Sequence, residues 1–470
     1  MEPSGGATVI DGSPLVALSS GLSRGRTSRR VIATCLWLVI IANAVVIVWL
    51  WLHGGGVSRV HGSAEVFTSL GRITGLVAVY LALIQVLLLA RLPPVERLVG
   101  FDRLTVWHRL NGKACISLVV AHTVLITVGY AGSEQISVPR EFSRLLSSYP
   151  GMVTATIGTV LMVGVVISSL VIVRRRLPYE GWYFVHLSIY AGIALSYLHQ
   201  LPTGNEFTTH TSQADYWIAL YVVTLALLVC FRLARPAWGA FRYRLRVAEV
   251  IREAPGVVSL HITGRHLDRL TAHAGQFMLW RFFTRGRWWQ AHPFSLSAAP
   301  DGRSLRLTVK DVGNFTSRIA DIPPGTAVLA EGPFGTFTHL QRTRPRVALI
   351  AGGIGITPIR ALFEALPAAP GELALIYRVI REEDLVFRTE LEEIARKRGA
   401  DLFFLVGDHR TVAGRDLLSP VQLLQLIPDI VEREVYLCGP HPMMARTEGS
   451  LHGAGVPGRQ IHSERFALAA

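Results

Sequence analysis

The sequence predicts a multidomain protein: an all-α bundle of six transmembrane helices, then an antiparallel β-barrel, then an α/β domain with a parallel sheet. Three observations predict this fold class. Long apolar runs fill the first half of the chain, short alternating segments follow Pro236, and strands alternate with helices from Arg346 onward. With 470 residues, 50% of them hydrophobic and only 17% charged, the chain is neither fully soluble nor disordered.

Each of six apolar segments is close to the length of about 20 helical residues that spans a bilayer. They cover residues 31–52, 72–91, 104–130, 152–173, 183–200 and 215–233. The residues before the first segment are rich in Gly, Ser and Arg, so residues 1–30 are expected to form a disordered basic tail. The membrane domain is therefore expected to occupy residues 31–235.

The net charge of +14 comes from 47 basic and 33 acidic residues. Arginines cluster before the first segment and after the second, fourth and sixth, at residues 24–30, 91–103, 174–176 and 232–244. The positive-inside rule then places both termini on the cytoplasmic side of the cell membrane. No nucleic-acid-binding motif accompanies the charge, so no nucleic acid partner is expected. The four cysteines form no CxxC pair, which argues against a disulfide framework or a zinc site.

Four histidines lie inside the apolar segments. His108 and His122 are fourteen residues apart in the third, and His186 and His199 are thirteen apart in the fifth. Polar groups at membrane depth are costly and usually functional, and histidine is a common axial ligand of haem iron. We expect His108 to share a level with His186, and His122 with His199; interhelical hydrogen bonding is the alternative role. A thirteen-residue step misses the same helix face by about 140°, so the fifth helix should be distorted or reach its two haems from different sides.

The alternating segments begin near Tyr243 and contain two candidate nucleotide-binding stretches. His292-Pro293-Phe294-Ser295-Leu296-Ser297 could pack along a flavin ring and donate hydroxyl hydrogen bonds, although alone it would suit any strand. Downstream lie a cation, a flexible turn and hydroxyls, at Lys310, Gly313, Thr316 and Ser317. A helix starting near Thr316 would direct backbone N–H groups at a pyrophosphate, and a capped helix without a ligand is the alternative.

The α/β region carries a glycine-rich turn between an apolar strand and a helix, from Ala351 to Pro358. Its glycines allow backbone to approach phosphate or nicotinamide closely, and proline suits a first helical turn. Arg378 ends the next strand, where an arginine can pair with a ribose 2′-phosphate and favour NADPH; a solvated surface charge is the other reading, for it and for Arg381. Cys438-Gly439-Pro440 ends the last long strand, at the sheet edge where such domains bind ligands; a buried structural cysteine is the alternative.

In this order, the motifs resemble the ferric reductase and NADPH oxidase superfamily, in which a six-helix di-haem membrane domain precedes a ferredoxin–NADP reductase-like module. The resemblance covers nearly the whole chain from about residue 31. It rests on the histidine spacing and on four further stretches: His292–Ser297, Gly352–Pro358, Cys438-Gly439-Pro440 and Glu464-Arg465-Phe466. The resemblance implies an FAD-binding barrel at residues 236–340 and an NAD(P)-binding domain at residues 341–470.

The resemblance also implies cofactors and residue roles. The cofactors are FAD, two haem b groups and NADPH, with NADH possible. The four histidines would be the metal ligands. The FAD site would comprise His292, Pro293, Phe294, Ser295, Ser297, Lys310, Gly313, Thr316 and Ser317. The nicotinamide site would comprise Gly352, Gly353, Gly355, Thr357, Pro358, Arg378, Cys438, Gly439 and Pro440. Cys438 and Thr357 would lie near the reacting nicotinamide, and Phe466 would stack on the flavin.

The expected activity is electron transfer from cytosolic NADPH through FAD and both haems to a small acceptor outside the lipid bilayer, ferric iron or another metal. Reduction of oxygen to superoxide is the first alternative. A membrane electron donor for a protein partner or a quinone is the second, and a non-redox transporter or scaffold the third. Arg72, Arg103 and Arg109 are candidates for contacts with haem propionates on the inner face. Oligomeric state is left open by the sequence.

Overall fold

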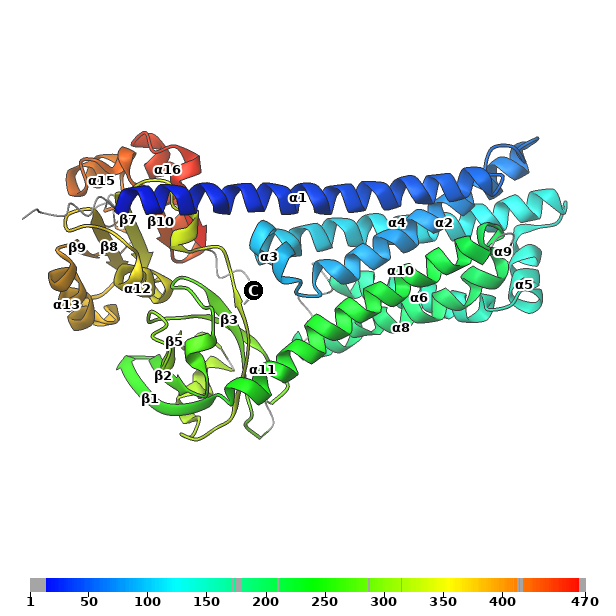
Figure 1. Ribbon diagram of the computed structural model, residues 1–470. Coiled ribbons are helices and arrows are strands. Elements are labelled where there is room, and N and C mark those ends of the chain that lie inside the picture. The colour runs from blue at the N-terminus through cyan, green and yellow to red at the C-terminus, as the bar shows by residue number, and fades with distance from the viewer. Residues whose placement is uncertain are drawn as a thin grey trace, which may run out of the picture. The chain divides into compact units, whose positions relative to one another are not determined.

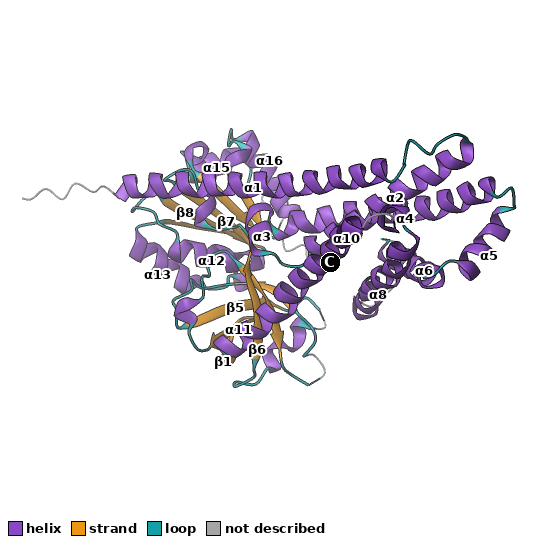
Figure 2. Ribbon diagram, turned by 45° about the vertical axis from the view of Figure 1, so that its right-hand side comes forward, coloured by secondary structure: helices purple, strands orange, loops and turns teal. Residues whose placement is uncertain are grey.

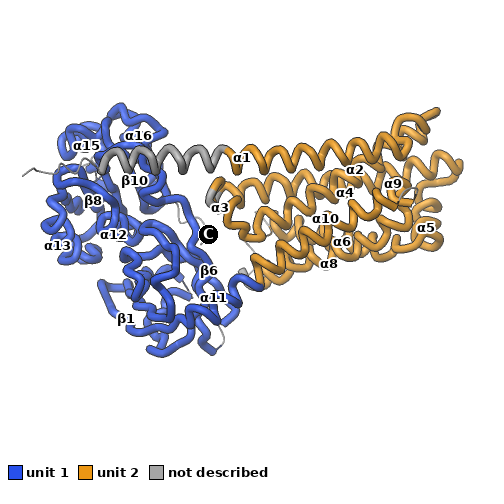
Figure 3. Tube along the Cα trace, in the orientation of Figure 1, with its two compact units in different colours: residues 1–26, 234–470 blue, residues 27–233 orange. Residues whose placement is uncertain are grey.

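The computed structural model describes residues 14–170, 173, 179–208, 211–285, 288–313, 315–408, 410–411, 414 and 417–464. Two compact units make up the chain, one of residues 27–233 and one of residues 1–26 and 234–470 (Figure 3). Arg174–Arg176 and Phe466, which the sequence analysis singled out, lie outside the described residues.

The first unit is helical (Figure 1). Its helices are α1 (Pro14–His53), α2 (Ser63–Leu88), α3 (Pro93–Val99), α4 (Phe101–Ser133), α5 (Val138–Ser148), α6 (Met152–Ser169), α8 (Tyr179–Thr203), α9 (Asn205–Thr208) and α10 (Thr211–Val229). Within the described residues, five helices are long and apolar enough to cross a membrane, in the ranges Val31–His53, Ser63–Leu88, Arg103–Ser133, Met152–Ser169 and Thr211–Tyr243. The expectation of six spans is thus met for five, because α8 does not reach the same apolarity. The expected disordered tail is wrong for residues 14–30, which continue α1.

Close backbone approach joins the membrane helices in pairs. α2 packs along α4, and α6 packs along α8. A Cβ at Gly71 would lie 2.8 Å from the Ile126 side chain, and one at Gly158 would lie 2.6 Å from the Gly192 carbonyl oxygen. Small residues at such contacts let membrane helices approach closely, which is how these two pairs are held without charged contacts.

The second unit begins with α11 (Arg235–Tyr243) and two three-stranded antiparallel sheets (Figure 2). One sheet has the order β1-β2-β5, from Arg246–Ala254, Val257–Thr263 and Ser304–Lys310; the other has the order β4-β3-β6, from His292–Ser295, Phe277–Phe282 and Val328–Phe334. Only isolated bridges join them, Arg246 to Ala327 and Leu296 to Leu307. The predicted closed barrel is therefore not confirmed, since the ladders between the sheets are single bridges and not continuous strand pairs.

A five-stranded parallel sheet follows, with the order β11-β10-β7-β8-β9. Its strands are β7 (Val347–Gly352), β8 (Leu373–Val379), β9 (Asp401–Val406), β10 (Glu434–Cys438) and β11 (Ile461–Glu464). The connecting helices are α12 (Ile356–Ala365), α13 (Arg388–Arg398), α15 (Pro420–Leu426) and α16 (His441–Gly453). β7, β8 and β10 are almost wholly buried, as expected for the continuous apolar runs of a parallel sheet covered on both faces.

The antiparallel sheets have a core of their own, and part of this region also packs into the core of the parallel-sheet region. Ala274 and Phe337 of the antiparallel region pack with Leu362 and Tyr436 of the parallel-sheet region. The Tyr436 hydroxyl donates a hydrogen bond of 3.0 Å to the Thr338 carbonyl. The two halves of this unit are consequently packed as one body.

Gly275 lies beside Phe337 and Leu362 of this core, so a substitution at Gly275 tests how tightly the core is packed. Its φ is +86°, and a Cβ would lie 1.9 Å from the Phe337 carbonyl oxygen. We expect Gly275→Ala to destabilise the unit by about 3 kcal/mol. The alanine would have to adopt a left-handed backbone conformation and would also overpack the contact with Phe337, and the two costs add together. Thermal unfolding of the purified chain, followed by tryptophan fluorescence, measures the change in stability. An unchanged transition would contradict the described packing.

A buried carboxylate, Glu434, joins β10 to β11. It lies 2.5 Å from Nε2 of His462 and accepts hydrogen bonds from the Thr343 amide (3.0 Å) and hydroxyl (2.9 Å). Burial alone raises the pKa of Glu434, but these hydrogen bonds hold it below the ordinary value of 4.5. A depressed carboxyl pKa stabilises the fold above the unfolded value, and the benefit disappears as the pH falls through the folded value.

Glu434→Gln is therefore expected to lower the melting temperature at pH 7. The difference in melting temperature between Glu434→Gln and the wild type should become smaller below pH about 4.5. Melting curves of both proteins across this range check the expectation. A difference that persists unchanged into acid would show that the lost contribution is not ionic.

Candidate functional site

The four membrane histidines meet in two pairs. The ring centroids of His108 and His186 are 6.1 Å apart, and those of His122 and His199 are 6.4 Å apart. α4 supplies one ring of each pair and α8 the other, although each helix packs mainly against a different neighbour. The rings thus face one another where the α2–α4 pair and the α6–α8 pair meet.

Residues 179–203 form a continuous α-helix with Pro202 in its last turn, so the helix is not broken between His186 and His199. Each of these two rings lies close to one ring of α4, His186 to His108 and His199 to His122. That the two haems are reached from different sides of α8, the other alternative, stays a prediction.

Neighbouring oxygen atoms contact one nitrogen of three of these rings. Nδ1 of His122 lies 2.7 Å from the Gly71 carbonyl, and Nδ1 of His108 lies 3.3 Å from that of Gln85. Nδ1 of His186 lies 3.3 Å from the Ser169 hydroxyl. A hydrogen bond at Nδ1 orients an imidazole and leaves Nε2 for a metal, as is usual in metal sites.

The pairs fit a metal bound between two imidazoles. Nitrogen–metal bonds of about 2 Å, plus about 1 Å from each nitrogen to its ring centre, give about 6 Å between ring centres. The observed 6.1 and 6.4 Å match this value. Within the described residues no group of three or more His, Cys, Asp or Glu could hold a metal.

An apolar cavity of about 160 Å³ adjoins His122 and His199. Gly75 lines it, and a Cβ there would lie 2.5 Å from Nδ1 of His122, so only glycine leaves room for the ring. Arg72 also lines the cavity and forms a buried ion pair with Glu206. Arg72 therefore lies with the pair expected at the outer level, and its assignment to the inner face is wrong, because α2 and α4 run in opposite directions.

Sequence reasoning missed the groups that orient the histidines. Gln85 donates a hydrogen bond of 2.8 Å from Nε2 to the His108 carbonyl and accepts one of 2.7 Å from Asn111. Amide side chains inside an apolar helix were a visible signal. Gly71 and Gly75 gave no signal, because glycines are common throughout the chain.

The predicted flavin motif forms β4 and ends in the core. His292 stacks on Phe315 with ring centroids 3.7 Å apart, and Phe294 lies parallel to both. Trp280, fully buried on β3, donates a hydrogen bond of 3.0 Å to the Phe294 carbonyl. Together they form an aromatic surface along β4, which Phe315 joins from the stretch that follows β5.

The described residues after β5, 311–313 and 315–317, bend around the Thr316 hydroxyl. The Thr316 hydroxyl accepts hydrogen bonds from the amides of Val312 (2.9 Å) and Gly313 (3.0 Å). A short 3₁₀-helix, Thr316–Asp321, begins where a helix was expected. Lys310 is exposed at the end of β5, and the Ser317 amide donates to the Gly313 carbonyl at 2.9 Å.

The two serines of the motif differ in their surroundings from what was expected. Ser295 is buried on β4, and Ser297 is fully buried just beyond it. The Ser297 hydroxyl accepts a hydrogen bond of 2.7 Å from Thr308, which also pairs with Ser259. The Ser297 hydroxyl, which was expected to face a flavin, is therefore hydrogen-bonded inside the core to β5 and, through Thr308, to β2.

The glycine-rich turn brings β7, α12 and β10 together. A Cβ at Gly355 would lie 2.4 Å from the Cys438 carbonyl oxygen, and one at Gly439 would lie 3.2 Å from the Gly352 Cα. Pairing of β10 with β7 sets Cys438 opposite Ala351. Gly352, Gly353, Gly355 and Cys438-Gly439-Pro440 thus meet at the carboxyl edge of the sheet, where α/β proteins bind ligands.

Most of the polar side chains expected at this edge form hydrogen bonds or ion pairs within the protein. Thr357 is buried, its hydroxyl donates to the Ile354 carbonyl at 3.1 Å, and Pro358 follows it in the first turn of α12. Cys438 is fully buried, and burial raises the pKa of its thiol, which stays protonated. Arg378 donates a hydrogen bond of 2.7 Å to the Gly414 carbonyl, whereas Arg381 pairs with acidic side chains.

Three regions of the chain match known families. Residues 74–197 match the ferric reductase like transmembrane component, residues 243–338 match the FAD-binding domain, and residues 349–449 match the oxidoreductase NAD-binding domain. The first region contains His108, His122 and His186 and ends two residues before His199; the second contains the aromatic strand β4, and the third the glycine turn.

Among curated relatives, an NADPH oxidoreductase of Mycobacterium tuberculosis is 27% identical over 251 residues, 50% of this chain and 63% of that protein. The ferredoxin reductase component of the 3-ketosteroid-9-alpha-monooxygenase of Mycolicibacterium smegmatis is 34% identical over 239 residues, 48% of this chain and 66% of that protein. The matches thus span less than two thirds of either relative.

Among solved structures, the flavohem-like FAD/NAD binding domain of nitric oxide dioxygenase from Vibrio cholerae O1 biovar El Tor is 24% identical with a TM-score of 0.40. The match covers 47% of this chain and 98% of that one. The family matches give the identification. The chain joins a ferric reductase like transmembrane component to an FAD-binding domain and an oxidoreductase NAD-binding domain.

Proposed function

We propose that this chain carries electrons across the cell membrane from cytosolic NADPH, through FAD and two b-type haems, to ferric iron or another metal outside. The pairing of four histidines at the spacing of a bis-imidazole metal site carries the proposal. The matched FAD-binding and NAD-binding domains in the same chain support it, because a haem path alone has no source of electrons.

Each residue group has a separate task. His108 and His186 would hold one haem, and His122 and His199 the other, with their Nδ1 contacts setting ring orientation. The aromatic surface of His292, Phe294 and Phe315 would receive the flavin. When bound, FAD and the haems supply the redox chemistry, which turns a two-electron donation into single-electron steps.

The glycine turn would admit the nicotinamide nucleotide at the carboxyl edge of the sheet. A side chain at Gly352 would reach Met443, and one at Gly355 would reach the backbone of β10, so the glycines keep this edge open. Arg378 at the end of β8 is the candidate contact for a 2′-phosphate, which favours NADPH over NADH.

For the membrane domain we propose α8 as a sixth span. It is 25 residues long, which suffices to cross a bilayer, and it carries one histidine of each pair. With six spans and arginines clustered in alternate loops, both termini lie in the cytoplasm.

Reduction of oxygen to superoxide is the second candidate. The cavity beside His122 and His199 is lined mainly by apolar side chains, and its buried Arg72 is neutralised by Glu206. Such a space suits a small uncharged acceptor. No described group of three metal-ligating side chains is present to bind a metal chelate.

The test uses purified protein under nitrogen, with visible spectra recorded as NADPH is added. We expect a reduced b-type haem spectrum, after which a ferric chelate or oxygen is admitted and the rates of reoxidation are compared. Faster reoxidation by oxygen would favour superoxide formation, and reoxidation only with an added protein or quinone would favour a donor subunit. Haem reduced by dithionite but not by NADPH would contradict the nucleotide or flavin assignment.

A further inference from the structure

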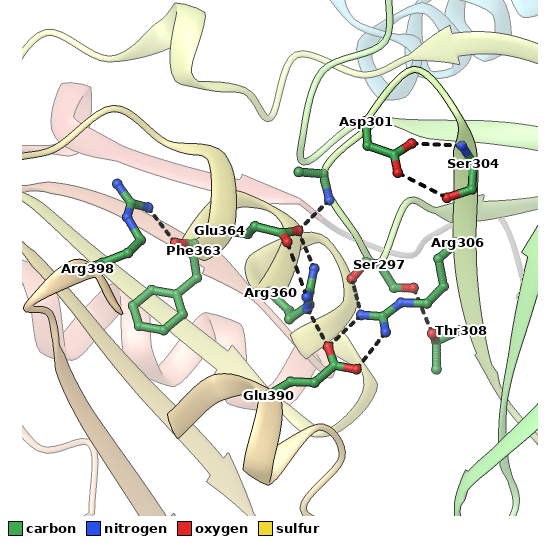
Figure 4. Close-up of polar contacts among 11 residues, drawn as sticks. Ser297, Asp301, Ser304, Arg306, Thr308, Arg360, Phe363, Glu364, Glu390 and Arg398 are labelled. Atoms are coloured by element: carbon green, nitrogen blue, oxygen red, sulfur yellow. Dashed lines mark hydrogen bonds and ion pairs between the residues drawn. The ribbon is translucent and has the colours of Figure 1, made fainter. Parts of the chain in front are cut away.

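Four charged side chains cluster where the FAD-binding and NAD-binding halves of one unit meet (Figure 4). The guanidinium of Arg306 on β5 donates hydrogen bonds to both carboxylate oxygens of Glu390 on α13, with Nη1–Oε1 at 2.7 Å and Nη2–Oε2 at 2.9 Å. Nε of Arg360 on α12 donates to the same Oε2 at 2.9 Å, and Arg360 also pairs with Glu364. One carboxylate therefore holds two guanidinium groups.

The arginines are buried and the carboxylates are half-exposed. The side chains of Arg306 and Arg360 are each 8% exposed, and Glu390 is 38% exposed. The Arg306 guanidinium also lies 4.5 Å from the Phe387 ring centre, a cation–π contact. Burial raises the pKa of Glu390, but the two arginines hold it below its ordinary value. Removing a carboxylate from this group leaves buried cations without compensation.

The cluster reaches both candidate cofactor segments. Nη2 of Arg306 donates to the Ser297 carbonyl at 3.0 Å, at the end of the flavin motif that begins with β4. Arg360 lies one turn into α12, the helix that starts at the glycine turn. A parallel link joins the same elements, since the Ala299 amide donates to Glu364 at 2.8 Å.

We propose that Glu390 is a positioning residue for hydride transfer from the nicotinamide to the flavin. Its carboxylate ties the end of the flavin motif, through Arg306, to the helix of the nicotinamide turn, through Arg360. In the step concerned, the C–H bond of the reduced nicotinamide breaks and its hydrogen passes with both electrons to oxidised FAD, leaving NADP⁺. The inference rests on the proposed function and concerns the alignment of the two segments, because misplacement by about 1 Å costs about 100-fold in rate.

The deciding experiment compares Glu390→Gln with the wild type in the purified full-length protein. Anaerobic stopped-flow spectroscopy follows flavin reduction as NADPH is varied. We expect the limiting rate to fall by at least about tenfold, while the NADPH concentration at half-maximal rate and the FAD content stay unchanged. With NADPH deuterated at the transferred position, the isotope effect on flavin reduction should persist or grow in the variant.

Glu393→Gln is the matched control. It lies on the same helix, is 53% exposed and pairs only loosely with Lys397, at 3.6 Å. It is expected to behave as the wild type. Glu390→Asp keeps the negative charge on a shorter side chain and should recover part of the rate lost in Glu390→Gln. If Glu390→Gln does not retain FAD, Glu390→Asp replaces it in the comparison with the wild type.

Three results would overturn the proposal. The limiting rate of the Glu390 variants could equal that of Glu393→Gln, the rate could fall only in proportion to FAD content, or NADPH affinity could fall with the limiting rate unchanged. Failure of the proposed function gives a different result, since NADPH would then leave the wild-type flavin oxidised although dithionite reduces it.

Discussion

His122→Ala should leave the protein with one haem in place of two and stop electrons from reaching the outer acceptor. Its ring faces His199 at 6.4 Å and is held by the Gly71 carbonyl, so alanine removes one of two axial ligands and no neighbouring side chain replaces it. Removing an outer-shell partner of a metal ligand typically costs 10–100-fold, so losing the ligand itself should lower reduction of the acceptor by more than about 100-fold.

The pyridine haemochrome assay measures haem per chain, and stopped-flow spectroscopy measures flavin reduction. Flavin reduction by NADPH should continue at the wild-type rate, because the nucleotide-binding domains are untouched. His61→Ala is the control, since His61 is an exposed loop residue outside the helices. Full haem content in His122→Ala, with an unchanged reduced spectrum, would falsify the assignment of this histidine as a ligand.

Gly355→Ala should block entry of electrons at the other end of the path. The added Cβ would lie 2.4 Å from the Cys438 carbonyl oxygen and 2.7 Å from the Gly439 Cα. Backbone atoms of a buried strand cannot move aside as a flexible side chain can, so the start of α12 must shift from β10. We expect a loss of about 1–3 kcal/mol in stability and about 100-fold slower flavin reduction by NADPH.

Dithionite should still reduce flavin and haem in Gly355→Ala, because it does not use the nicotinamide site. Gly449→Ala offers a matched control in α16, where nothing lies within 4 Å of the added Cβ and alanine should stabilise the helix by about 1 kcal/mol. Equal rates of NADPH-dependent flavin reduction in the two variants would argue against nucleotide binding at this turn.

The order and type of most elements followed from local pattern. The apolar runs appear as α1, α2, α4, α6, α8 and α10, and the buried strands β7, β8 and β10 lie where continuous apolar runs predicted them. The expected membrane topology also predicted which histidines would pair, because the third and fifth spans run in the same direction and each carries its two histidines roughly 20 Å apart along the helix axis.

Other features depended on contacts between distant residues. The sequence left open whether α8 is distorted or reaches its two haems from different sides, whereas the structure shows a continuous helix with each histidine beside one of α4. The Ser297 hydroxyl was expected to face a ligand, but it is buried and accepts a hydrogen bond from Thr308 on β5. Arg72 was expected beside the inner pair but lies with His122 and His199, where its ion-pair partner Glu206 is 134 residues away in sequence.

By itself, the sequence determined the chemistry that this protein carries: two histidine pairs at membrane depth, an aromatic strand and a glycine turn at a sheet edge. Composition and periodicity record those features within short stretches of chain. Only the tertiary structure decided how they are held, through Gly75 against His122 and through Glu390 between two arginines, 84 and 30 residues away. Packing and charge pairing join residues that are distant in sequence, so no local pattern indicates them.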